Sequence, residues 1–185
     1  MRSVRYRGRA LPIAWWVVTG SKGHFPETCH VERVNRVREI LPAGADVVVL
    51  GDGKFDGTAL QATLADAQWH YGCRTAKNTL LDEAGDEFHW ADLPLSPGER
   101  LGIPEVQFTQ DRHGPVLAMG WWAEAHKEPW YLITNFELIE EACRFYKKRF
   151  HIETFFSDQK SRGFHLHNSH LSHPEQLSRL LMAAC

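Results

Sequence analysis

The first half of the chain switches between strand-like and helix-like patterns of apolar residues. Residues 2–8 and 10–19 have the composition of strands, and the second run, ALPIAWWVVT, is apolar on both faces. We therefore expect 10–19 to be a central strand of a sheet, with Pro12 near its beginning, where a missing amide is tolerated. Apolar residues at helical spacing over 32–41 predict a helix. The short apolar run at 46–50 predicts a buried strand in a parallel position.

A second helix at 58–67 and a further strand at 69–76 complete an alternation of strands and helices over residues 10–76. This order predicts an α/β fold in which helices cover the faces of a sheet. Residues 77–135 differ, because Gly and Pro are frequent and the apolar runs are short, so they predict an antiparallel β-rich insertion. Residues 136–185 return to helical patterns, including one long predicted helix over 138–162.

One stripe of that long predicted helix contains polar residues that could bind a metal ion or a phosphate. Tyr146, Arg149, Glu153 and Lys160 lie at offsets 0, 3, 7 and 14, and at about 100° per residue they share a stripe about 60° wide. An apolar stripe borders it, formed by Phe145, Ile152 and Phe156. One interpretation is a polar stripe that faces a cleft. The alternative is an exposed face held by ion pairs four residues apart, such as Arg149 with Glu153.

Composition is ordinary for a globular protein. The 185 residues are 43% hydrophobic and the formal charge is −2, so no overall basicity indicates nucleic acid, although basic residues gather between 144 and 162. None of the four cysteines forms a CxxC pair, which argues against a zinc knuckle or a redox motif. No secretory signal is recognisable, and the run 10–19 is too short to span a bilayer. We expect a cytoplasmic, reduced protein.

A second polar element, GDGKFDG, follows the predicted strand at 46–50 and places Asp52 between two glycines. Carboxyl ends of strands line the ligand crevice of open α/β sheets, so Asp52 is a candidate metal ligand. The alternative is that an aspartate caps the next helix, a role that Asp56 suits better. Asp52 and Glu153 could share Mg²⁺, which prefers oxygen ligands, and two such ions can clamp an in-line phosphoryl transfer. Arg149 and Lys160 would then hold phosphates.

These motifs resemble a known family. The spacing Tyr146-x2-Arg149-x3-Glu153-x6-Lys160 is similar to the YREK signature of bacterial insertion-sequence transposases of the IS-four type. GDGKFDG resembles the segment that carries their second catalytic aspartate, and RALPIAWWVVTG and FFSDQKSRGFHLHNSHLSHPEQLSRLL resemble further segments of those proteins. The resemblance covers most of the chain. It implies a ribonuclease H-like, retroviral-integrase-like mixed sheet with a β-rich insertion before the C-terminal helices.

The resemblance also implies an activity, a metal and partners. A DDE triad would hold two Mg²⁺ or Mn²⁺ ions and cut and join DNA at transposon ends, with Asp52 as the second acidic ligand and Glu153 as the third. Tyr146, Arg149 and Lys160 would contact DNA phosphates. Active relatives work as dimers on paired DNA ends, so the implied partners are DNA and a second copy, at the bacterial nucleoid.

Two further expectations concern single features. WYLITN resembles the strand that closes the family's β insertion, so Trp130 would stack on a flipped-out base; the alternative is a core aromatic. The four histidines of an HxHxxHxxH run could ligate zinc, but no cysteine lies nearby, so we expect no zinc site there. These histidines are His165, His167, His170 and His173.

The triad's first aspartate has no counterpart in residues 1–9, none of which is acidic. We therefore expect an N-terminally truncated transposase whose residues 1–76 are a partial ribonuclease H-like core, followed by the insertion 77–135 and the helices 136–185. We expect this polypeptide alone to show little or no strand transfer. The alternative is a catalytically dead remnant that binds DNA or a full-length transposase and inhibits it.

Overall fold

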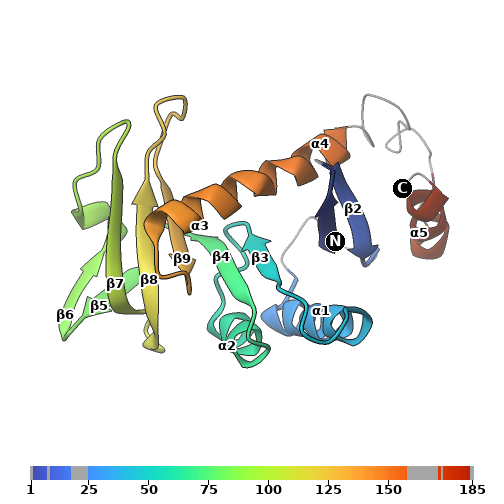
Figure 1. The fold of residues 1–185 in the computed structure, drawn as a ribbon, viewed down its shortest axis with the longest axis horizontal. Helices are drawn as coiled ribbons and strands as arrows, with labels where there is room; N and C mark the ends of the chain where they lie inside the picture. Colours follow the sequence, from blue (N-terminus) through green and yellow to red (C-terminus); the bar gives the residue numbers. More distant parts are fainter. Residues whose placement is uncertain (1, 8, 18–24, 158–170, 172, 184–185) are drawn as a thin grey trace. The chain divides into compact units, whose positions relative to one another are not determined.

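The computed structural model describes residues 2–7, 9–17, 25–157, 171 and 173–183 (Figure 1). Two compact units divide the chain. We call residues 42–147 the central unit, and residues 1–41 together with 148–185 the terminal unit. The three sequence-based segments, with boundaries after residues 76 and 135, stay a prediction.

The terminal unit contains a two-stranded antiparallel sheet, and its helices α1 and α4 both contact strand β2. Its elements are β1 (Arg2–Tyr6), β2 (Arg9–Ala14), α1 (Glu27–Ile40), α4 (His151–Ser157) and α5 (Pro174–Ala183). The expectation of a central strand over 10–19 is wrong, because β2 ends at Ala14 and, in the part of the chain that the structure describes, pairs with β1 alone. Helices, rather than further strands, contact the described part of this run. Trp15 hydrogen-bonds to Ser178 of α5, and the ring of Trp16 lies over Arg33 of α1.

Helix α1 begins at Glu27, five residues before the predicted start at 32. The signal was Pro26, whose ring presets a φ (−54° here) that suits the start of a helix, and Glu27 adds a favourable negative charge in the first turn. The helix ends at Ile40, and the next residue, Leu41, is extended because a residue before proline avoids the α conformation.

The central unit is built on a seven-stranded sheet in the order β3-β4-β9-β8-β7-β5-β6. Its strands are β3 (Val48–Gly51), β4 (His70–Thr75), β5 (Leu80–Glu83), β6 (Asp86–His89), β7 (Arg100–Phe108), β8 (His113–Trp121) and β9 (Trp130–Thr134). Strands β3 and β4 are parallel and the remaining pairs are antiparallel, so the sheet is mixed. The predicted α/β class is therefore confirmed, and the strands within residues 80–134 pair antiparallel as predicted.

Strand β3 is parallel, as predicted, but it lies at the edge of the sheet and its valines and leucine are only half-buried. The hairpin of β5 and β6 has no counterpart in the sequence-based prediction. Its strands LLDE and DEFH are short and acidic, and only Leu81 and Asp82 in them are buried. Strand β9 pairs with both β4 and β8, so the strands of the predicted insertion belong to the same sheet as β3 and β4.

Helix α2 (Thr58–Asp66) matches the predicted helix, but the predicted cap is wrong. The N-cap residue is Gly57, and no side chain caps the helix. The Asp56 carboxylate instead accepts a hydrogen bond from the Thr75 hydroxyl at 2.7 Å, and so ties the start of α2 to strand β4.

The long helix predicted over 138–162 is interrupted. Helix α3 (Ile139–Tyr146) is followed by a 3₁₀ turn, η2 (Lys147–Phe150), and then by α4. A 3₁₀ turn advances about 120° per residue instead of about 100°. The wheel that placed Tyr146 and Glu153 on one continuous stripe is therefore not valid across η2.

Candidate catalytic site

Asp52 follows strand β3 directly and begins a tight turn. Its main-chain carbonyl accepts hydrogen bonds from the amides of Lys54 (2.7 Å) and Phe55 (2.9 Å). Its carboxylate Oδ1 accepts one from the Gly53 amide at 2.6 Å. Asp52 is exposed. The turn thus presents an exposed carboxylate at the carboxyl end of a parallel strand, as the sequence predicted.

Gly51, the last residue of β3, is required by sterics rather than by backbone conformation. A Cβ added here would lie 2.4 Å from Phe55 Cβ and 2.8 Å from Cys73 Sγ, closer than real atoms approach. A Cβ added at Gly53 would meet nothing within 4 Å. Close packing on Gly51 therefore fixes the position from which the Asp52 side chain departs.

Tyr146, at the end of α3, reaches the same turn. Its hydroxyl donates a hydrogen bond to the Gly51 carbonyl at 3.2 Å, and the residue is 1% exposed. Its ring packs edge-on against Trp130, with centroids 5.8 Å apart. The predicted contact of Tyr146 with a DNA phosphate stays a prediction. In the structure the hydroxyl holds the strand end that carries Asp52.

Trp130 lies in an aromatic cluster beside Tyr146. The residue is 8% exposed, and its ring packs against Trp121 (5.4 Å, 84°) and His126 (4.0 Å, 42°). Stacking on a flipped-out base stays a prediction. A base could reach the indole face only after His126 moves aside, because that imidazole covers it at close range.

Two cations border this aromatic cluster. Lys147 Nζ lies 5.1 Å from the Trp121 ring centroid, and the Arg100 guanidinium lies 5.7 Å from it. Burial raises the pKa of the Cys143 thiol, while Arg100 and Lys147 oppose that rise, so their positive field reaches the interior of the central unit. The sequence did not point to Arg100, which lies in the predicted insertion. Lys147 follows Tyr146 directly, but from the sequence it is only one of the basic residues between 144 and 162.

Arg149 and Glu153 belong to the terminal unit and form an ion pair. Arg149 Nη2 donates to Glu153 Oε1 at 2.8 Å, and the two side chains are 14% and 52% exposed. The ion pair that the alternative named is therefore present, but the Arg149 side chain is largely covered and does not lie on a fully exposed face. The role of Glu153 as a metal ligand and that of Arg149 at a phosphate stay predictions.

Lys160 lies outside the described residues, as do His165, His167 and His170. Across 2–7, 9–17, 25–157, 171 and 173–183, no three His, Cys, Asp or Glu side chains gather into a metal-binding group. Nor is any helix in these ranges long and apolar enough to cross a membrane.

Residues 27–185 match the family model of the transposase DDE domain, which is most of the chain. The chain belongs to this transposase family. No curated protein matched in a separate comparison.

Membership of the DDE transposase family implies DNA as the substrate and a divalent metal ion held by carboxylates. The Asp52 turn suits such an ion, because Mg²⁺ and Mn²⁺ prefer oxygen donors and Mg²⁺ takes only one or two carboxylates from the protein. The exposed Asp52 and Glu153 side chains of this DDE transposase are donors of that kind.

Proposed function

We propose that this DDE transposase chain carries the second and third acidic residues, Asp52 and Glu153, of an IS-four-type catalytic core with a ribonuclease H-like fold. In this proposal the core cleaves DNA at insertion-sequence ends and transfers the cut strand. The observation that carries the proposal is the exposed carboxylate of Asp52 at the end of β3, in a chain whose residues 27–185 match the DDE domain.

When bound, two Mg²⁺ or Mn²⁺ ions supply a clamp for the attacking and leaving oxygens of an in-line displacement at phosphorus. The protein's part is to hold oxygen ligands in place. Gly53 donates to one carboxylate oxygen of Asp52, and Tyr146 anchors the residue before it, so the turn is preorganised. Arg149 orients Glu153, and Lys160 would add positive charge for a phosphate.

Binding of Mn²⁺, followed by calorimetry or electron paramagnetic resonance, tests the metal assignment. We expect Asp52→Asn to weaken Mn²⁺ binding by about tenfold or more. Mutating a residue that only hydrogen-bonds to a metal ligand commonly lowers metal affinity at least that much, and Asp52 is proposed as a direct ligand. Asp46→Asn is the matched control, because Asp46 is exposed, lies just before β3 and undergoes the same loss of charge. Equal effects of the two substitutions would contradict the assignment of Asp52.

Activity separates the proposal from its rival, a non-catalytic chain that binds DNA or a full-length transposase. The first carboxylate of the triad is assigned to no residue of this sequence, so we expect the purified chain with Mn²⁺ to transfer little or no transposon-end DNA. Robust cleavage that is lost in Asp52→Ala would overturn that expectation. Inhibition of an active transposase by the chain would favour the rival.

A further inference from the structure

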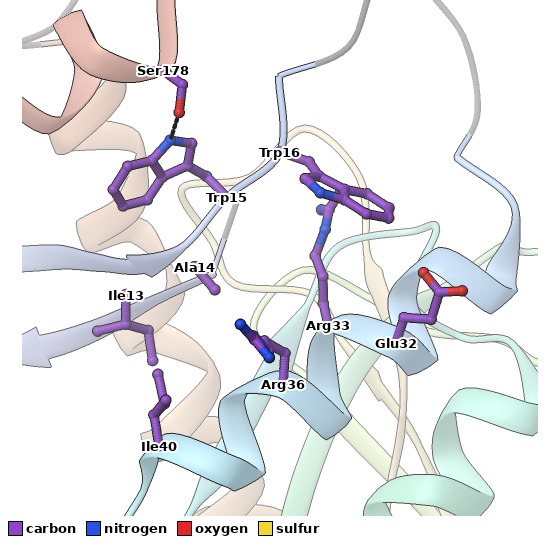
Figure 2. A pocket seen from close by; sticks show the side chains of 9 residues that line it. All are labelled: Ile13, Ala14, Trp15, Trp16, Glu32, Arg33, Arg36, Ile40 and Ser178. Carbon is purple, nitrogen blue, oxygen red and sulfur yellow. Dashed lines mark hydrogen bonds between the residues drawn. The ribbon is translucent and has the colours of Figure 1, made fainter. Parts of the chain in front are cut away.

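The terminal unit contains a pocket that the proposed catalytic site does not use (Figure 2). It has a volume of about 550 Å³ and lies between the end of β2, helix α1 and helix α5. Its lining includes Ile13, Trp15, Trp16, Arg33, Arg36 and Ser178. A pocket of this size lies within the range typical of small-molecule sites, roughly 300–1,000 Å³.

Arg33 is the unusual member of this lining. It is 8% exposed, on the face of α1 that also buries Val34 and Val37. Trp16 and Phe25 lie over its guanidinium, with ring centroids 5.2 Å and 4.9 Å away. Burial lowers the pKa of Arg33. Among the described residues, its Nε and Nη2 atoms have no hydrogen-bond partner.

The two aromatic rings compensate only part of the cost of burying this cation. A ring attracts the guanidinium through its flat face, whereas the N–H donors of arginine point outward in the guanidinium plane. Buried donors without acceptors are unfavourable, and more so when they carry charge. These two atoms are closed to solvent, so a ligand with anionic oxygens would satisfy them once a shift of the Trp16 or Arg33 side chain opens them to the pocket, in the paired geometry that arginine forms with phosphate.

The residues around Arg33 restrict the charge and shape of the ligand that the pocket can bind. Trp16 is 50% exposed and offers an aromatic face beside Arg33. Arg36 contributes a second cation, which pairs at the exposed surface with Glu39 at 3.0 Å. Glu32 also lines the pocket and limits the total negative charge that it accepts. A single phosphate group attached to a flat base fits this arrangement better than a compact polyanion does.

We propose that this pocket binds one nucleotide of a DNA strand, with its phosphate on Arg33 and its base against Trp16. The choice of DNA over other anions rests on the proposed function. Aromatic platforms beside positive charge are the usual means of binding single strands without regard to sequence.

The test measures binding of a fluorescein-labelled oligothymidine strand by the full chain, by anisotropy over a range of salt concentrations. We expect Arg33→Met to weaken binding roughly tenfold and to reduce the salt dependence by about one phosphate contact. Arg38→Met is the matched control, because Arg38 is exposed on the same helix and does not line the pocket. Equal losses in the two variants would overturn the proposal.

Stability distinguishes a binding role from a structural one. A methionine at position 33 replaces an incompletely paired buried charge, so we expect the melting temperature of Arg33→Met to stay level or rise while DNA binding falls. A lowered melting temperature with unchanged DNA binding would assign Arg33 to the core and overturn the proposal. Crosslinking of a 5-iododeoxyuridine strand to the peptide that contains Trp16 would support it.

Two further experiments identify the class of anion that the pocket binds and distinguish this pocket from the proposed metal site. We expect inorganic phosphate or a glutamate-rich peptide to compete with the strand only at far higher concentrations; competition at equal concentration by either would overturn the nucleotide assignment. We expect Arg33→Met to weaken strand binding while it keeps wild-type Mn²⁺ affinity, and the Mn²⁺ affinity of Asp52→Asn tests the metal site separately. A failure of either site is thus visible without the other.

Discussion

The hydroxyl of Tyr146 donates a hydrogen bond to the carbonyl oxygen of Gly51, 3.2 Å away and 95 positions earlier in the chain. This contact joins the end of α3 to the last residue before Asp52. The aspartate is exposed, but the strand end from which it departs is held from inside the central unit.

We expect Tyr146→Phe to keep the packing of the ring and to remove only this hydrogen bond. The free energy of unfolding should fall by about 1 kcal/mol, the usual net worth of such a bond. Mn²⁺ binding at Asp52 should weaken as well, because the turn loses its anchor. Urea titration and Mn²⁺ calorimetry measure the two effects. Tyr131→Phe is the control on the neighbouring strand β9, and a loss of Mn²⁺ affinity there would contradict a specific role of Tyr146.

Alanine substitution of the two glycines that flank Asp52 should affect stability at one position and not at the other. Gly51→Ala forces a Cβ against Phe55 and Cys73, and we expect a loss of about 1–3 kcal/mol in the free energy of unfolding from overpacking. Gly53→Ala meets open space, and we expect a change within about 0.5 kcal/mol. Thermal or urea unfolding of the two variants measures the difference. Similar losses would mean that sterics do not fix this strand end.

The predicted stacking of a DNA base on Trp130 can be tested through its neighbour. His126 covers the indole at 4.0 Å, so His126→Ala uncovers the ring and leaves Trp130 in place. If a flipped base uses that face, the substitution should increase the quenching of 2-aminopurine placed at the flipped position, since less displacement is needed. Unchanged or weaker quenching would argue that Trp130 is a core aromatic. Trp130→Ala is a poorer test, because the cavity alone would cost about 3–5 kcal/mol.

Alkaline pH should unfold the central unit through Tyr71. Burial, and to a smaller extent the nearby Cys73, raises the pKa of this phenol. The unfolded chain then loses the proton near pH 10, where the folded chain keeps it. The contribution of Tyr71 to stability is therefore complete below about pH 10 and is lost above it, by up to about 1.4 kcal/mol per pH unit. Unfolding midpoints between pH 9 and 11, compared between wild type and Tyr71→Phe, should show a shallower decline in the variant.

Local patterns predicted the parts of the fold that depend on neighbours in sequence. The apolar run before Asp52 identified a parallel strand, and the spacing over 58–67 identified α2 almost to the residue. The central-strand prediction for 10–19 was wrong, because an apolar run does not show whether strands or helices will contact it; here β2 pairs with β1 alone among the described residues and contacts helices α1 and α4. Nor did a periodic pattern over 138–162 reveal the 3₁₀ turn at 147–150.

In the candidate site, too, features that depend on neighbours in sequence were predictable and those that depend on distant contacts were not. The place of Asp52 after its strand could be read from the sequence, since strand and turn are contiguous. The burial of Tyr146 could not, because it depends on Gly51 in a distant element. Arg33 gave a weak signal, since it lies four residues before Val37 and shares its apolar face, but only the structure shows that its donors are unpaired.

Strand β4 lies between β3 and β9, so both of its edges are hydrogen-bonded. Asn135 fastens its beginning, accepting from the Tyr71 amide (2.9 Å) and donating to the Trp69 carbonyl (3.0 Å). In hydrogen exchange, β4 amides should therefore open only when the whole central unit unfolds. Amides on the outer edge of β3 should exchange through small local openings. The protein would then keep a slow interior strand beside a faster edge strand, whose end at Gly51 is held by Tyr146.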